Sequence, residues 1–183
     1  MQVSETQIPA VRILLPAKHG DHRGFFSETY SHQKLKEAGI DIDFVQDNQS
    51  LSVEKGVIRG LHYQIAPMAQ DKLIRVVRGA ILDVAVDIRR GSPTFGKHVS
   101  AVISAENWRQ ILVPIGFAHG FVTLDANTEV IYKVSNYYSP QHERGIRWND
   151  PKLGIDWGIG ASAAVLSKRD AEHPLFAEAI DLF

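Results

Sequence analysis

The chain has 183 residues, with 20 Lys and Arg, 21 Asp and Glu, eight His and no Cys, and its formal charge is −1. This length fits one domain, residues 1–183, and 44% hydrophobic with 22% charged residues is typical of a globular protein rather than a disordered one. The balanced charge argues against a general nucleic-acid-binding surface, and the lack of cysteine excludes disulfides, thiolate metal sites and thiol nucleophiles.

Neither a signal peptide nor a membrane span is predicted. The first residues lack a basic segment followed by an apolar core. The longest apolar stretch, residues 111–124, is interrupted by Pro114, Gly116, His119 and Gly120. We therefore expect a cytoplasmic protein that has neither a membrane nor a nucleic acid as its partner.

The first element with clear signals is a short helix over residues 31–38. Ser31 is a suitable N-cap, and Gly39 follows the expected end. Further along, residues 72–78 and 81–88 have the composition of strands, and we expect Gly79 and Ala80 to join them in a hairpin.

Residues 81–88 alternate strictly between two kinds of side chain. Leu82, Val84 and Val86 share one face, whereas Asp83 and Asp87 lie on the other. This period of two is typical of a strand with one buried and one exposed face.

The remaining strands follow at short intervals set by Gly and Pro. They are predicted over residues 99–103, 110–113, 118–124 and 129–134. A last helix is expected within residues 167–183, where Pro174 limits its start. The fold class is therefore all-β, a sandwich or barrel with short peripheral helices.

Two histidines lie in apolar segments, His62 and His119. A single His in such a place is more often a hydrogen-bonded core residue than a base or a metal ligand. No His-x-His pair, helical His pair or nearby carboxylate at ligand spacing accompanies them, so we expect no metal.

Other polar residues have both a structural and a functional interpretation. The basic residues Arg23, Arg59, Lys72, Arg75 and Arg78 form either a solvated strand face or a pyrophosphate pocket. No glycine-rich phosphate loop is present. Tyr132, Tyr137 and Tyr138 are either packing residues or residues that stack on a base or act as an acid, and Asp170 by itself is a surface carboxylate or a cap.

Ten segments, taken together and in order, resemble the dTDP-4-dehydrorhamnose 3,5-epimerase family. They are 21–28 (DHRGFFSE), 44–48 (FVQDN), 56–64 (GVIRGLHYQ), 72–75 (KLIR), 87–89 (DIR), 92–96 (SPTFG), 113–121 (VPIGFAHGF), 132–140 (YKVSNYYSP), 145–151 (GIRWNDP) and 166–170 (LSKRD). The resemblance implies a cupin-type jelly roll that forms a homodimer, which agrees with the pattern of strands.

The reaction that this resemblance implies inverts C3 and C5 of dTDP-4-dehydro-6-deoxy-D-glucose. Both hydrogens are α to the C4 ketone, so the reaction needs a base, an acid on the opposite face and a positive group beside the ketone oxygen. It needs no redox cofactor and no metal.

The resemblance also implies roles for individual residues. His62 is the base, Asp170 its orienting carboxylate, Tyr132 the acid, and Lys72 the cation beside the C4 oxygen. The implied substrate contacts are Arg23, Glu28, Gln46, Asp47, Asn48, Arg59, His119, Tyr138 (stacked on thymine), Glu143 and Arg169, which stands where the family commonly has Lys. Tyr137 matches no such role and is expected to be a packing residue.

Arg59 and His62 are three residues apart, so in a regular strand their side chains face opposite sides. Both can line one site only if the strand is irregular. We therefore predict a bulge at Gly60.

Three alternatives to the 3,5-epimerase stay open. The first is a relative that inverts only C3 or only C5, or that isomerises the keto-sugar. The second is a module that binds a sugar nucleotide without turnover. The third is a metal-dependent cupin.

Overall fold

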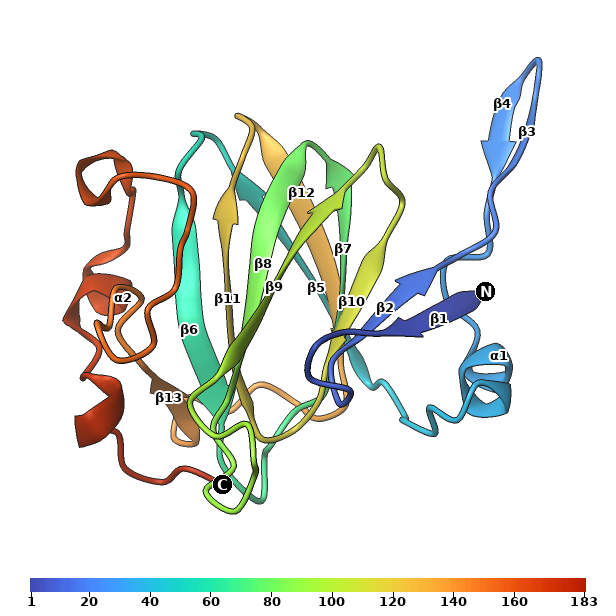
Figure 1. Ribbon diagram of the computed structural model, residues 1–183. Coiled ribbons are helices and arrows are strands. Elements are labelled where there is room, and N and C mark those ends of the chain that lie inside the picture. The colour runs from blue at the N-terminus through green and yellow to red at the C-terminus, as the bar shows by residue number, and fades with distance from the viewer.

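The computed structural model describes all 183 residues and contains two antiparallel sheets that face each other, with a small hairpin projecting from one side (Figure 1). One sheet has the order β1 (Gln2–Glu5), β2 (Arg12–Leu15), β10 (Gln110–Val113), β7 (Lys72–Arg78), β12 (Thr128–Val134) and β5 (Gln46–Ser52). The other has the order β13 (Glu143–Gly145), β6 (Ile58–Gln64), β11 (Phe117–Thr123), β8 (Ala80–Asp87) and β9 (His98–Ser104). The hairpin consists of β3 (His19–Asp21) and β4 (Gly24–Phe26). The predicted all-β sandwich is confirmed.

The main core lies between the two sheets. Ile74 of β7 and Ile111 of β10 pack there with Ala85 of β8 and with Phe117 and Phe121 of β11. Burial of this apolar surface is the main force that holds the sheets together.

A second core covers the outer face of the β6–β11–β8 sheet. Val84 and Val86 of β8 pack there against Trp148 and Trp157 from the C-terminal segment, which runs along the outside of β6 (Figure 1). The prediction that residues 81–88 have one exposed face is therefore wrong. Both faces are buried, and even Asp83 and Asp87 have no exposed surface.

The predicted hairpin between residues 72–78 and 81–88 is also wrong. Strand β7 pairs with β10 and β12, whereas β8 pairs with β9 and β11 in the other sheet. The chain crosses from one sheet to the other at Gly79, which has a φ of +73° and lies against Thr128. A glycine at positive φ thus marks a crossing between sheets here, not a two-residue turn.

The predicted bulge at Gly60 is confirmed. In the pairing of β6 with β11, His62 lies opposite His119 and Arg59 lies opposite Phe121, so three steps of β6 match two steps of β11. Gly60 has a φ of +133°. A Cβ atom at this position would lie 2.5 Å from Gly120 Cα.

Both helices are short. The predicted N-terminal helix is confirmed as α1 (His32–Glu37), in which the Ser31 hydroxyl accepts a hydrogen bond from the Lys34 amide. The C-terminal helix is limited to α2 (Lys168–Glu172), and two 3₁₀ turns (Ala161–Ala163 and Phe176–Glu178) flank it. None of the helices is long and apolar enough to cross a membrane.

Candidate active site

Two adjoining cavities open where the strands of both sheets approach each other. The first has a volume of about 310 Å³ and the second about 250 Å³. Both are lined by His62, Lys72, Tyr132 and Glu143. Because β6 and β13 belong to one sheet and β7 and β12 to the other, the sandwich itself brings these four side chains together.

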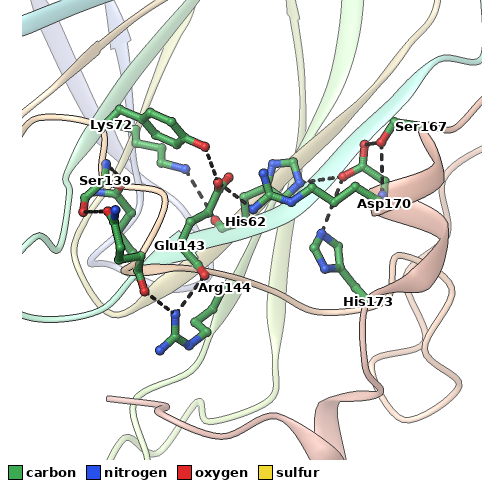
Figure 2. Close-up of polar contacts among 12 residues, drawn as sticks. His62, Lys72, Ser139, Glu143, Arg144, Ser167, Asp170 and His173 are labelled. Atoms are coloured by element: carbon green, nitrogen blue, oxygen red, sulfur yellow. Dashed lines mark hydrogen bonds and ion pairs between the residues drawn. The ribbon is translucent and has the colours of Figure 1, made fainter.

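His62 and Asp170 form a short polar contact in this site. His62 Nε2 lies 2.5 Å from Asp170 Oδ1, although the residues are 108 positions apart (Figure 2). Asp170 is held from its own helix, because the Ser167 hydroxyl caps α2 by accepting from the Asp170 amide and donates to Asp170 Oδ2 at 2.8 Å. The carboxylate is therefore fixed toward the imidazole.

The surroundings of this pair move both pKa values downward. Burial lowers the pKa of His62, and the opposing effect of Asp170 is smaller. Burial alone would raise the pKa of Asp170, but the neighbouring His173 and the hydrogen bonds with His62 and Ser167 hold it below its usual range. At neutral pH the pair is thus a neutral imidazole beside an ionised carboxylate.

The surroundings also shift the pKa values of Lys72 and Tyr132. The ammonium of Lys72 donates a hydrogen bond to the His62 carbonyl oxygen at 3.4 Å, and desolvation lowers its pKa to about 8. Burial raises the pKa of Tyr132. Lys72 is therefore a cation, and Tyr132 a protonated phenol, near neutral pH.

Glu143 is at the centre of a polar cluster on the rim of the first cavity (Figure 2). Its Oε2 accepts a hydrogen bond from the Tyr138 hydroxyl at 2.6 Å and forms an ion pair with Arg169, also at 2.6 Å. Burial opposes ionisation, but these donors lower the pKa of Glu143. Arg169 itself lines neither cavity, and its contact with the site is the ion pair with Glu143.

The second cavity adds cationic and imidazole groups, from Arg59 and His119. His119 Nε2 lies 2.8 Å from Oδ2 of Asp83, and both side chains are buried. Asp83 is a residue that the sequence did not single out, and its contact fixes the orientation of the His119 ring.

The amide side chains Gln46 and Asn48 line the first cavity, and Gln46 donates to Asn48 at 2.8 Å. Asp47, which lies between them on β5, lines neither cavity. Because side chains alternate along a strand, Asp47 faces away from the cavity. Its carboxylate pairs with Lys133 at 2.9 Å instead.

Three residues singled out from the sequence lie elsewhere. Arg23 pairs with Asp21 on the projecting β3–β4 hairpin, and Glu28 pairs with Lys34 of α1. Neither lines the two cavities. Tyr137 is 60% exposed, so the expectation that it is a packing residue is wrong.

Several residues near the site were not found from the sequence. Gln64 and Ser50 line the cavities, and Ser167 and His173 contact Asp170. For Ser167 a signal existed, because Ser three residues before Asp is a helix-start pattern. His173 follows Asp170 at the i+3 spacing of helix neighbours.

His62, Asp170 and His173 are also the residues best placed to hold a metal, since their ligand atoms lie within 4.8 Å of one another. The 2.5 Å spacing between His62 and Asp170 is that of a hydrogen bond. Ligand atoms around an ion with bonds of about 2.0–2.1 Å are spaced farther apart. The cluster is therefore arranged to share a proton in this structure.

A sandwich cavity that combines a His–Asp pair, a protonated Tyr and a cationic Lys is equipped for proton transfer to and from carbon. Comparison with known proteins agrees with this chemistry. The family model of dTDP-4-dehydrorhamnose 3,5-epimerase matches residues 5–178. The chain therefore belongs to the dTDP-4-dehydrorhamnose 3,5-epimerase family.

Individual relatives cover almost the whole chain. The dTDP-4-dehydrorhamnose 3,5-epimerase of Salmonella typhimurium is 51% identical over 181 residues, which is 98% of each protein. The structure of dTDP-6-deoxy-D-glucose-3,5-epimerase from Legionella pneumophila in complex with dTDP-4-keto-L-rhamnose matches with a TM-score of 0.93 and 46% identity, over 98% of this chain and 94% of that one. A 3'-monoepimerase from Streptomyces bikiniensis matches with a TM-score of 0.87 and 35% identity, over 94% and 87% of the two chains. The cupin-type jelly roll expected from the motifs is confirmed.

Proposed function

We propose that the chain is an epimerase that inverts C3 and C5 of dTDP-4-dehydro-6-deoxy-D-glucose and gives dTDP-4-dehydro-L-rhamnose. The observation that carries the proposal is the contact of 2.5 Å between His62 and Asp170 beside Lys72 and Tyr132 in one cavity system. The names of the related enzymes supply the substrate class. We further propose that residues 1–183 act as a single catalytic domain.

His62 is the proposed base. Its Nε2–H donates to Asp170, which leaves Nδ1 as the nitrogen that takes the proton from the carbon next to the ketone. The electron pair of the C–H bond moves toward C4 and its oxygen, and an enolate forms. Asp170 stabilises the imidazolium that results.

Lys72 and Tyr132 complete the proposed step. The Lys72 ammonium stabilises the negative charge on the C4 oxygen, an effect typically worth about 3–4 kcal/mol. Tyr132 then donates its phenolic proton to the other face of the carbon, so the centre is inverted. The raised pKa of Tyr132 supports this role, because the phenol is protonated at neutral pH.

The proposed substrate contacts surround this centre. Arg59 and His119 in the second cavity suit the pyrophosphate. The first cavity suits the sugar and the thymine through Gln46, Asn48 and Tyr138. Glu143, with its ion pair to Arg169, holds the Tyr138 hydroxyl in place. Asp47 is assigned an indirect role, since its carboxylate pairs with Lys133.

A homodimer is proposed as the working form. Arg23 matches a substrate-contact position of the family but lies on the projecting hairpin, outside both cavities of its own chain. A second copy of the chain gives this hairpin a cavity to reach. The nearby aromatic residues Phe25 and Phe26 are 56% and 71% exposed, which supports a partner surface.

We also propose a cytoplasmic location, because the sequence contains no cysteine.

Deuterium incorporation tests the proposal. Metal-free protein is incubated with dTDP-4-dehydro-6-deoxy-D-glucose in deuterated water, and the sugar is analysed by NMR. Deuterium at both C3 and C5 is the expected result. No exchange despite tight binding of the nucleotide sugar would identify a binding module, and exchange that requires added metal would identify a metal-dependent cupin.

An epimerase of one centre is the second candidate. The likeness to a 3'-monoepimerase favours keeping it, because that protein shares the fold with 35% identity. Deuterium at only one of the two carbons would support it.

A further inference from the structure

His173 is a buried polar side chain that the proposed reaction does not use. The residue is 9% exposed, and its Nε2 has no hydrogen-bond partner. The polar atom that faces Nε2 is Oδ1 of Asp170, 3.6 Å away. His62 contacts the same oxygen, and the two imidazole rings meet edge to face with centroids 5.4 Å apart (Figure 2).

The position of His173 is fixed on both sides. Arg147 donates from its side chain to the His173 carbonyl at 3.0 Å and from its amide to the Pro174 carbonyl at 2.8 Å. On the other side the ring lies against Gly145, where a Cβ atom would be 2.5 Å from His173 Nδ1. The missing side chain at residue 145 therefore provides the space that the imidazole occupies.

We propose that His173 is a positioning residue for the base: its Nε2–H, which faces Asp170 Oδ1 at 3.6 Å, attracts that oxygen electrostatically and holds it toward His62. The inference rests on the proposed function, in which His62 removes the proton. A second donor withdraws charge from the shared oxygen, so His62 is less basic than it would be in an isolated His–Asp pair.

The charges around the cluster are consistent with this role. Burial opposes ionisation of Asp170, and His173 is the first of the neighbouring side chains that lower its pKa, ahead of His62 and Ser167. His62 faces Asp170, Lys72 and Glu143. His173 and Ser167 both contact Asp170 from outside the two cavities, and of these two only His173 faces the oxygen that His62 contacts.

Substitution of His173 by Phe and by Gln separates the polar contact with Asp170 from packing. Phe keeps a ring in the space beside Gly145 but has no donor, whereas Gln keeps a neutral N–H donor. The pKa of His62 is measured by NMR titration of substrate-free protein, and kcat and KM are measured from deuterium exchange. Glu172→Gln is the control, because it changes an exposed charge on the same helix without touching Asp170.

The expected result for His173→Phe is a His62 pKa higher by about half a unit. We also expect an unchanged KM and a kcat lower by about tenfold, by analogy with the lower end of the loss when outer partners of metal ligands are removed. His173→Gln should restore most of both values, and Glu172→Gln should leave both unchanged.

The proposal is wrong if His62 titrates with the same pKa in the wild type and in His173→Phe. It is also wrong if both variants lose activity and melting temperature alike, since His173 is then a packing residue. Failure of the proposed function would look different. The wild-type protein would then exchange no deuterium, while the pKa of His62 would still depend on residue 173.

Discussion

Burial acts in the same direction on His62 and Lys72 but with opposite consequences for the chemistry. It lowers both pKa values, because it disfavours the charged form of each side chain. For His62 the lowered pKa keeps the proposed base unprotonated. For Lys72 it brings loss of the positive charge close to the physiological range. We therefore expect activity to be confined to the pH range between the titrations of His62 and Lys72.

The first prediction is a bell-shaped dependence of kcat/KM on pH. Activity rises as His62 loses its proton, with a pKa below the ordinary value of about 6.5, and falls as Lys72 loses its proton at about 8. Exchange rates measured from pH 5 to 10 check the profile. Lys72→Arg keeps the charge at all these pH values, so its alkaline limb should be absent. An alkaline limb that persists in this variant would exclude Lys72 as its source.

The second prediction concerns the base itself. His62→Ala should lower kcat by at least the roughly 10²–10⁴-fold of one general base while nucleotide-sugar binding is largely kept. Steady-state kinetics and calorimetric binding measure the two effects. Near-normal turnover would exclude the assigned role.

The third prediction uses Arg59 as a contrast. Its side chain lines the second cavity, forms no hydrogen bond or ion pair with His62 or Asp170, and donates to Ser52 at 3.2 Å. Arg59→Ala should weaken nucleotide-sugar binding more than it lowers kcat. An unchanged affinity would remove Arg59 from the pyrophosphate site.

At the scale of elements, the sequence was informative where a local rule was broken. The spacing of Arg59 and His62 conflicts with a regular strand, and the bulge at Gly60 resolves that conflict. Gly79 was also a clear turn residue, but it was ambiguous, because a glycine at positive φ suits both a hairpin and a crossing between sheets. Which of the two forms depends on pairing partners far away in the chain.

Distant partners also explain the remaining differences. The face of β8 that carries Val84 is covered by residues 146–179. The local sequence of β8 contains no pattern that predicts this contact. In the site, resemblance to a family indicated Asp170, whereas residue patterns alone gave a surface carboxylate or a cap. His173 was found by neither kind of reasoning, because its position beside Asp170 depends on the space that Gly145 leaves.

The fourth prediction tests this space. Gly145→Ala places a Cβ atom against the His173 ring and should destabilise the protein by about 1–3 kcal/mol, as overpacking does. Thermal or denaturant unfolding measures the change. In a His173→Ala background the ring is absent, so the same substitution should cost much less. Equal losses in both backgrounds would show that the two residues are not coupled.

At the scale of the whole molecule, the β3–β4 hairpin is the feature that a single chain does not explain. It projects away from the sandwich (Figure 1) and carries Phe25, packed on Trp108 with centroids 4.9 Å apart, and the exposed Phe26. Apolar side chains on a projecting hairpin gain stability when another surface covers them.

The fifth prediction is that Phe26→Ser weakens self-association. Sedimentation velocity of the wild type should show a dimer, and the variant should dissociate at higher protein concentration because it buries less apolar surface. Tyr137→Ser is the control, since Tyr137 is exposed to a similar degree but lies far from the hairpin in sequence. A wild-type monomer, or an equal effect of both substitutions, would contradict the proposed assembly.

The distance along the chain between His62 and Asp170 has a consequence for biosynthesis. The residues that form the core between the sheets are all contained in residues 8–130, and a chain is synthesised from its N-terminus. The ribosome thus completes the sandwich strands before it adds Asp170 and the segment that covers the outer face. A nascent chain that ends before residue 170 lacks the acidic partner of His62, so the proposed catalytic pair can form only when the last part of the protein has been made.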